Sequence, residues 1–213
     1  RKAKTMTTTA ETTDMQSLVS FARDRGACRE ARVWLATQSD PRAAWETCER
    51  PDWMIWYARR RDVDPKVFVR IACDCARTVL WLVPEGENRP RLAIEVAERR
   101  MRGEATIDEV RDAAYAAEAA AADAEGGVDG GVGGTYAAVY AAVYTAAAAA
   151  AADATYAAAY AAVYTAEAAA YAAYVVDAAA VLFDQAKADA RKRANIQMCR
   201  IVRSHLRYED VAL

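Results

Sequence analysis

The sequence TYAAVYAAVYTAAAAAAADA at residues 135–154 is followed by TYAAAYAAVYTAEAAAYAAY at residues 155–174. The two lines form a 20-residue tandem repeat, identical at 15 of 20 positions, and together they hold 23 Ala and 8 Tyr. Alanine is the best helix former, and these forty residues contain neither Gly nor Pro. The stretch therefore predicts helix, and it sets an all-α fold for the chain.

Each repeat carries tyrosines four residues apart, which lie on one face of a helix. A shift of 20 residues turns a straight helix by about 200° beyond whole turns, so the two stripes would face nearly opposite sides. Either one long helix packs on both sides, or the chain breaks near Asp153–Thr155 and the halves pair antiparallel. The rings are candidates for filling gaps between helices or for binding a partner: Tyr136, Tyr140, Tyr144, Tyr156, Tyr160 and Tyr164.

The composition bounds the class of protein. A net charge of −2 over 213 residues gives no signal for nucleic-acid binding, and no run of 18 apolar residues has membrane character. Five cysteines without a signal peptide indicate reduced thiols in the cytoplasm. Cys73 and Cys75 would point about 200° apart on a helix, and His205 is the one histidine, so no zinc site is expected.

Capping signals divide the remaining chain into helices. Asp40-Pro41 and Asp64-Pro65 each place a cap before a proline at the first helical position, and Thr106 with Glu109 forms a capping box. We predict a multi-helix bundle of about eight helices, with long Ala/Tyr-rich and C-terminal helices. We expect a disordered tail over residues 1–13, followed by one all-α domain over residues 14–207. A flexible Gly-rich loop at residues 125–134 lies within that domain, and residues 208–213 form a C-terminal tail.

Two stretches between residues 51 and 83 attract particular attention. KVFVRIACDCARTVLWLV, residues 66–83, is nearly apolar around its circumference and is expected to be the central buried helix, with Asp74 and Arg77 able to pair. DWMIWYARRR, residues 52–61, places aromatic residues at i, i+3 and i+4. Its candidates for binding a partner or ligand are Trp53, Trp56, Tyr57 and Arg59.

Several segments resemble one known family. They are ACDCARTVL (72–80), NRPRLAIEVAERRMRGEATIDEVRDAAYAAEAAA (88–121) and MCRIVRSHL (198–206). Together they are similar to the Imm-5-like immunity proteins of bacterial polymorphic-toxin systems and phages. The resemblance implies an all-α protein that binds and neutralises a toxin made by its own genome. It assigns no catalytic residue, and no cofactor or metal ligand is carried over.

Three functions follow as hypotheses. The first is a non-catalytic immunity or inhibitor protein with a protein partner, a toxin or host effector. The second is a phage anti-defence protein that sequesters a nucleotide-type signalling ligand with Tyr and Arg side chains. The third is a self-assembling helical protein built through the repeat. An enzyme is not expected, because the sequence contains no P-loop, nucleophile-elbow or zinc-protease motif.

Overall fold

The structure is a computed structural model that describes residues 15–61, 63–125, 137–138, 140–145, 147, 161, 164 and 183–212. Every regular element in these residues is a helix, so the predicted all-α bundle is confirmed. Contacts between Cα atoms divide the chain into two compact units. Unit 1 joins residues 1–48 to 206–213, and unit 2 spans Glu49–His205. The expected single domain over residues 14–207 stays a prediction.

The helix starts lie where the capping signals put them. The Asp40 carboxylate accepts a hydrogen bond from the Ala43 amide at 2.6 Å, and Asp64 accepts one from the Lys66 amide at 2.9 Å. In the predicted capping box, the Glu109 amide donates to the Thr106 hydroxyl while the Thr106 amide donates to the Glu109 carboxylate. These side chains satisfy donors that have no partner inside the helix.

Unit 1 contains a helix over residues 15–24, then α2 (Arg29–Leu35), α3 (Pro41–Thr47) and α11 (Tyr208–Val211). Within this unit, α11 packs on α3. Arg42 forms an ion pair with Glu209, and its guanidinium lies 4.8 Å from the centroid of the Tyr208 ring. The C-terminal residues, expected as a tail, therefore contain a helix that is part of a folded unit.

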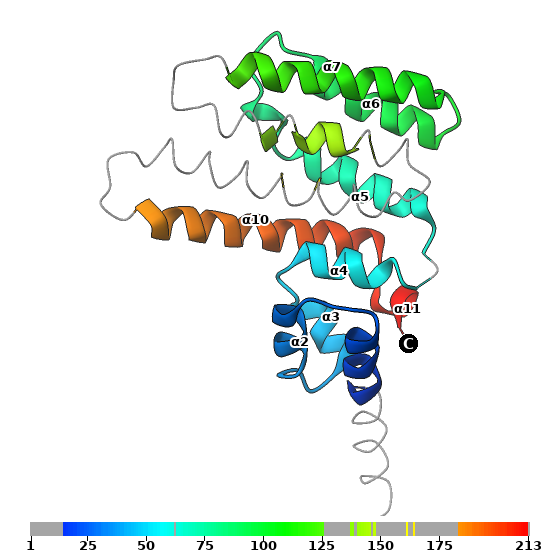
Figure 1. Cartoon of the computed structure of the whole chain (residues 1–213), viewed down its shortest axis with the longest axis vertical. Coiled ribbons are helices and arrows are strands. Elements are labelled where there is room, and N and C mark those ends of the chain that lie inside the picture. The colour runs from blue at the N-terminus through cyan, green and yellow to red at the C-terminus, as the bar shows by residue number, and fades with distance from the viewer. Residues whose placement is uncertain are drawn as a thin grey trace, which may run out of the picture. The chain divides into compact units, whose positions relative to one another are not determined.

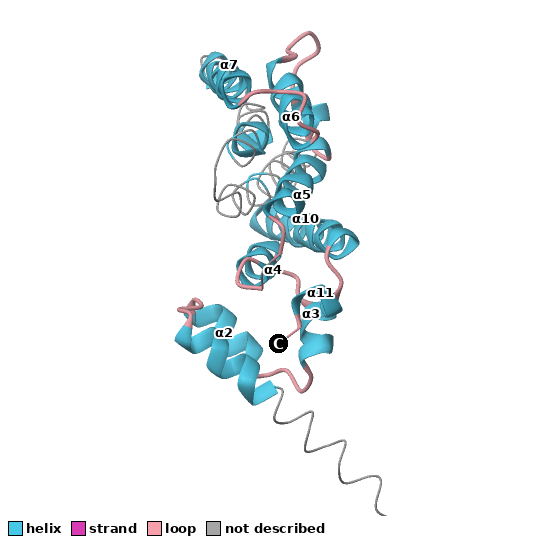
Figure 2. Cartoon of the chain, turned by 90° about the vertical axis from the view of Figure 1, so that its right-hand side faces the viewer, coloured by secondary structure: helices cyan, strands magenta, loops and turns pink. Residues whose placement is uncertain are grey.

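Unit 2 is built from two layers of helices (Figures 1 and 2). One layer is the row α6, α5, α10, in which α5 contacts both neighbours. In the other layer, α7 packs on α6, α4 packs on α10, and described residues 137–138, 140–145 and 147, here called the first-repeat segment, contact α5. The element bounds are α4 (Pro51–Ala58), α5 (Pro65–Arg77), η1 (Leu80–Leu82), α6 (Arg89–Met101), α7 (Ile107–Glu125) and α10 (Phe183–His205).

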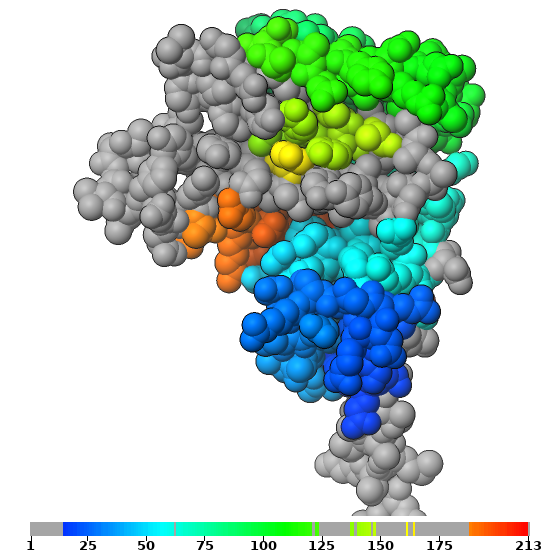
Figure 3. All heavy atoms as spheres, viewed as in Figure 1, coloured from blue at the N-terminus to red at the C-terminus, as the bar shows by residue number. Residues whose placement is uncertain are grey.

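Small side chains let these helices approach closely. The first-repeat segment has three fully buried alanines, Ala138, Ala141 and Ala142, and α5 has two, Ala72 and Ala76. The segment also lies beside α7, where Tyr140 and Val143 pack against Ala120 (Figure 3). Methyl groups on both surfaces allow axes to come nearer than larger side chains would. The alanine bias thus serves packing between helices.

Thr145 fixes the first-repeat segment to α5. Its side chain is fully buried, and its hydroxyl lies 2.8 Å from the Ala141 carbonyl oxygen and 3.2 Å from the Ala72 carbonyl oxygen. The first contact is local to its own helix, whereas the second crosses to α5. A buried hydroxyl without such a partner would be costly. This residue therefore specifies which part of α5 the repeat covers.

Tyr164 of the second repeat lies against the first-repeat segment, which excludes one straight helix from residue 140 to residue 164. The Tyr164 ring stacks on Tyr144 with centroids 5.2 Å apart, and on Tyr140 at 5.4 Å. On a straight helix, residues 144 and 164 would be separated by about 30 Å. The alternative with a break between the halves is the one compatible with these contacts. The point of the break, near Asp153–Thr155, lies outside the described residues.

The central helix, α5, is amphipathic and not apolar all round, so that prediction was wrong. Its buried residues include Phe68, Ile71 and Cys75, whereas a charged stripe remains exposed. The prediction was based on the large number of apolar residues in this stretch, whereas the four charged residues recur at a regular helical spacing. Spacing on the helix decides burial because residues three or four apart share a face.

Candidate functional site

The charged stripe of α5 consists of Lys66, Arg70, Asp74 and Arg77, all exposed. Their spacing of four, four and three residues keeps them on one face. Ala72, whose carbonyl faces Thr145, is on the opposite side of the helix. The stripe therefore lies on the face of the α6–α5–α10 row that is turned away from the first-repeat segment.

Two interhelical pairs link this stripe to the neighbouring helices. Arg77 donates three hydrogen bonds to the Glu98 carboxylate of α6, at 2.8 to 3.0 Å. His205 Nε2, at the end of α10, lies 2.7 Å from Asp74 Oδ2. The expected Asp74–Arg77 pair is thus wrong, because each side chain has a closer partner across a helix interface. Nor is Asp74 buried: its side chain is 49% exposed.

A hollow of about 300 Å³ opens between these three helices. Its lining combines charged groups with two apolar side chains: Arg70, Cys73, Asp74, Glu98, Met101, Arg102 and His205. The α5 residues come from adjacent turns of one face, the α6 residues from its last turn, and His205 from the last residue of α10. The sequence separation between α5 and α10 hid this grouping from sequence analysis.

Arg70 differs from the other charged residues of the hollow. Asp74 pairs with His205, Glu98 with Arg77, and Arg102 with Glu104 at 2.8 Å. Arg70 has no ion pair or hydrogen bond within the described residues. It precedes Asp74 by one helical turn, but the Asp74 carboxylate is directed to His205. A guanidinium with five donors is therefore available at the hollow.

The thiol of Cys73 does not supply reactive chemistry to the hollow. The residue is buried, and this burial, reinforced by the Glu98 and Asp74 carboxylates, raises the pKa of the thiol to about 12. The same effect of burial raises the pKa of Cys75. Since the thiolate is the nucleophile and the metal ligand, both residues act as small apolar groups near neutral pH.

The aromatic candidates on α4 are half-buried, whereas Arg59 is exposed. The Arg50 guanidinium lies 4.6 Å from the Trp53 ring centroid, and the Arg60 guanidinium lies 3.8 Å from that of Trp56. Arg60 also donates to the Trp56 carbonyl at 2.8 Å. Each indole thus has one face covered by an arginine of the same chain, so these rings are held in fixed orientations.

The tyrosine candidates divide into two groups. Tyr140, Tyr144 and Tyr164 are half-buried and form one cluster of stacked or tilted rings. The remaining three, Tyr136, Tyr156 and Tyr160, lie outside the described residues. The cluster brings one ring of the second repeat, Tyr164, against two rings of the first-repeat segment. Whether any of the six binds a partner stays a prediction.

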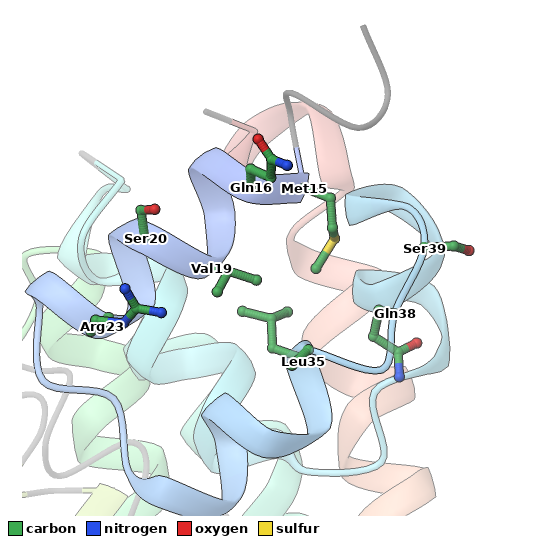
Figure 4. A pocket seen from close by; sticks show the side chains of 9 residues that line it. Met15, Gln16, Val19, Ser20, Arg23, Leu35, Gln38 and Ser39 are labelled. Carbon is green, nitrogen blue, oxygen red and sulfur yellow. The ribbon is translucent and has the colours of Figure 1, made fainter. Parts of the chain in front are cut away.

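A second hollow, of about 550 Å³, belongs to unit 1 (Figure 4). It lies between the helix over residues 15–24 and the end of α2, with Val19 and Leu35 facing each other across it. Its lining is mostly apolar or uncharged, and Arg23 is the one charged member. None of the sequence-predicted site residues lies there.

The described residues contain neither a candidate metal site nor a candidate membrane-spanning helix. No group of three or more His, Cys, Asp or Glu side chains in that part of the chain has the arrangement of a metal site. Among the same residues, no helix has both the length and the apolar character needed to span a bilayer.

One known protein family matches the part of the chain that contains α5, α6 and α7. A family model described as Imm-5 like putative immunity protein matches residues 62–200, more than half of the chain. This chain belongs to that family. The match to the Imm-5 like family contains α5, α6 and α7 entirely, and six of the seven residues that line the hollow of unit 2. Searches of curated proteins and of solved structures give no significant match.

Sequence reasoning identified the family but missed the hollow. The i, i+4, i+8, i+11 spacing of charged residues along residues 66–77 could have revealed two of its seven lining residues, Arg70 and Asp74. Asp74 was considered as a partner for Arg77, and Arg102 only as part of a segment that resembles the Imm-5 like family. The contribution of His205 could not be read from the sequence, because 131 positions separate it from Asp74.

Proposed function

We propose that this chain is an immunity protein that neutralises a toxin by direct binding, without catalysis. The observation that carries the proposal is the family match over residues 62–200. An inhibitor of this kind needs a preorganised surface, since binding is weakened when side chains must be ordered on association. Unit 2 offers such a surface, with alanine-packed helices and interhelical pairs at Arg77–Glu98 and Asp74–His205.

The α4 residues remain proposed contacts with the partner. Trp, Tyr and Arg supply a large share of binding energy at protein interfaces, and all three are present at Trp53, Trp56, Tyr57 and Arg59. The cation–π contacts of the two indoles support this proposal, because they limit the freedom that the rings would lose on binding. We place the encounter in the cytoplasm, in line with five reduced cysteines.

The two other functions stay predictions. Sequestration of a nucleotide would call for stacking on aromatic rings, and neither hollow described above has a Tyr or Trp in its lining. Self-assembly through the repeat would need an exposed surface on residues 135–174, most of which lie outside the described residues. The binding of a protein partner is therefore the function that the family match and the geometry support best.

The proposal is tested by co-expression with candidate toxin genes from the same genome. Wild-type chain is expected to restore growth and to co-elute with the toxin domain at a fixed ratio. Trp56→Ala should weaken the complex, whereas Trp81→Ala, an exposed tryptophan on η1, serves as the matched control. Continued toxicity at equal expression, without a complex, would refute direct neutralisation. Loss of binding in Trp81→Ala alone would indicate that the partner contacts η1 and not α4.

A further inference from the structure

We propose that the hollow between α5, α6 and α10 receives an acidic side chain of the protein partner, with Arg70 as the residue that binds it. This inference deepens the proposed function and rests on it, because the partner is the toxin. It names a contact surface, a partner chemistry and an anchoring residue on the outer face of the α6–α5–α10 row. This face is distinct from α4, which packs on α10 in the other layer.

The available charge at the hollow is positive. The hollow has two carboxylates: Asp74 is paired with His205, and Glu98 is paired with Arg77. Arg102 forms an ion pair with Glu104. Arg70 is exposed and makes no ion pair or hydrogen bond with any described residue. An incoming group would thus encounter one uncommitted guanidinium beside charges that are already compensated.

The chemistry of that group follows from the guanidinium. Its planar array of N–H donors matches a carboxylate in a two-point contact, which is stronger and more specific than a single hydrogen bond. A lysine or arginine of the partner would meet Arg70 with like charge. The two carboxylates could attract such a cation only by giving up hydrogen bonds at 2.7 to 3.0 Å.

The size of the hollow limits what can enter. Pockets for drug-sized molecules and cofactors typically have about 300 to 1,000 Å³, and this one, at about 300 Å³, is at the lower end. It suits one or two side chains rather than a nucleotide with its sugar and base. Cys73 and Met101 provide apolar contacts for the methylene groups of a Glu or Asp. Removal of water by these groups strengthens the ionic contact.

The first arm of the test compares Arg70→Glu with Arg193→Glu by titration calorimetry against the toxin domain that the wild type neutralises. Arg193 is the matched control, because it is an exposed helical arginine of unit 2 that makes no ion pair or hydrogen bond with any described residue. We expect Arg70→Glu to raise the dissociation constant about tenfold or more, and Arg193→Glu to change it less than about twofold. Equal losses would indicate general electrostatics and overturn the assignment. Tighter binding by Arg70→Glu would identify a basic partner and also overturn it.

A second arm separates this inference from the proposed function. If no toxin binds the wild type, the proposed function fails, and the hollow is still tested with N-acetyl-glutamate α-amide, whose one carboxylate is that of the side chain, in ¹⁵N-labelled protein. The Arg70 Nε–H resonance should shift with N-acetyl-glutamate α-amide and not with N-acetyl-lysine α-amide, which carries no carboxylate, and the His205 ring signals should respond in parallel. Absence of any shift at Arg70 would refute the carboxylate site. Arg70→Gln, which keeps size and polarity, checks that the effects of Arg70→Glu do not come from misfolding.

Discussion

Replacing Thr145 with valine isolates the contact that holds the first repeat against α5. Valine has nearly the same shape and lacks only the hydroxyl, which lies 3.2 Å from the Ala72 carbonyl oxygen and 2.8 Å from that of Ala141. Both carbonyls are in helices, where backbone amides are their usual donors, so neither is left unsatisfied. Thr145→Val should then lower the free energy of unfolding by the net contribution of one buried hydrogen bond, about 1 kcal/mol. For a protein of this size, it corresponds to a fall in Tm of about 2–4 °C.

Thr47 provides the control. Its hydroxyl donates to the Ala43 carbonyl at 2.7 Å, which repeats the local contact of Thr145, but the residue is exposed and its hydroxyl has no hydrogen bond to a second helix within the described part of the chain. Thr47→Val should change the free energy of unfolding by less than about 0.5 kcal/mol. Urea unfolding measures both variants, and hydrogen exchange of peptides around Ala72 shows where protection is lost. An unchanged or higher stability of Thr145→Val would refute the idea that this hydroxyl positions the repeat.

Further predictions concern the capping box and the thiols. Thr106→Ala should destabilise unit 2 by about 1 kcal/mol in urea unfolding, because the amide of Glu109 loses its acceptor. In native protein at pH 8, a thiol reagent should titrate Cys28 quickly and the four buried cysteines only after denaturation; rapid reaction of a second thiol would contradict their burial. Above pH 9, unfolded Cys73 and Cys75 lose protons that the folded thiols keep, because burial raises both pKa values. The free energy of unfolding should fall by about 1.4 kcal/mol per pH unit for each thiol, and replacing both cysteines with alanine should reduce that slope.

The local parts of the fold could be predicted because they depend on neighbours in the chain. The caps at Asp40, Asp64 and Thr106 contact backbone groups two or three residues away, so their geometry is written in a short stretch of sequence. Gly26 and Gly103 follow helix ends with φ of 72° and 78°, a region that side chains disfavour, so a glycine at these positions is itself a local signal. The family match likewise depends on residue order alone.

The candidate site could not be predicted in the same way, because its pairs connect distant helices. Sequence spacing favoured Asp74 with Arg77, whereas packing brought His205 of α10 and Glu98 of α6 closer to them. A pair three residues apart on an exposed helix contributes little, so the arrangement of neighbouring helices decides which partner is chosen. With the Asp74 carboxylate directed to His205, Arg70 makes no ion pair or hydrogen bond with any described residue.

The sequence by itself determined that this chain is helical, where its helices begin and to which family it belongs, since helix propensity, capping and residue order are local properties. Tertiary structure decided that Tyr164 of the second repeat packs on Tyr140 and Tyr144 of the first, that α5 exposes a charged stripe, and that three helices form a hollow beside Arg70. Those outcomes depend on how alanine-lined surfaces fit together in space, and a linear pattern of small side chains is compatible with more than one fit.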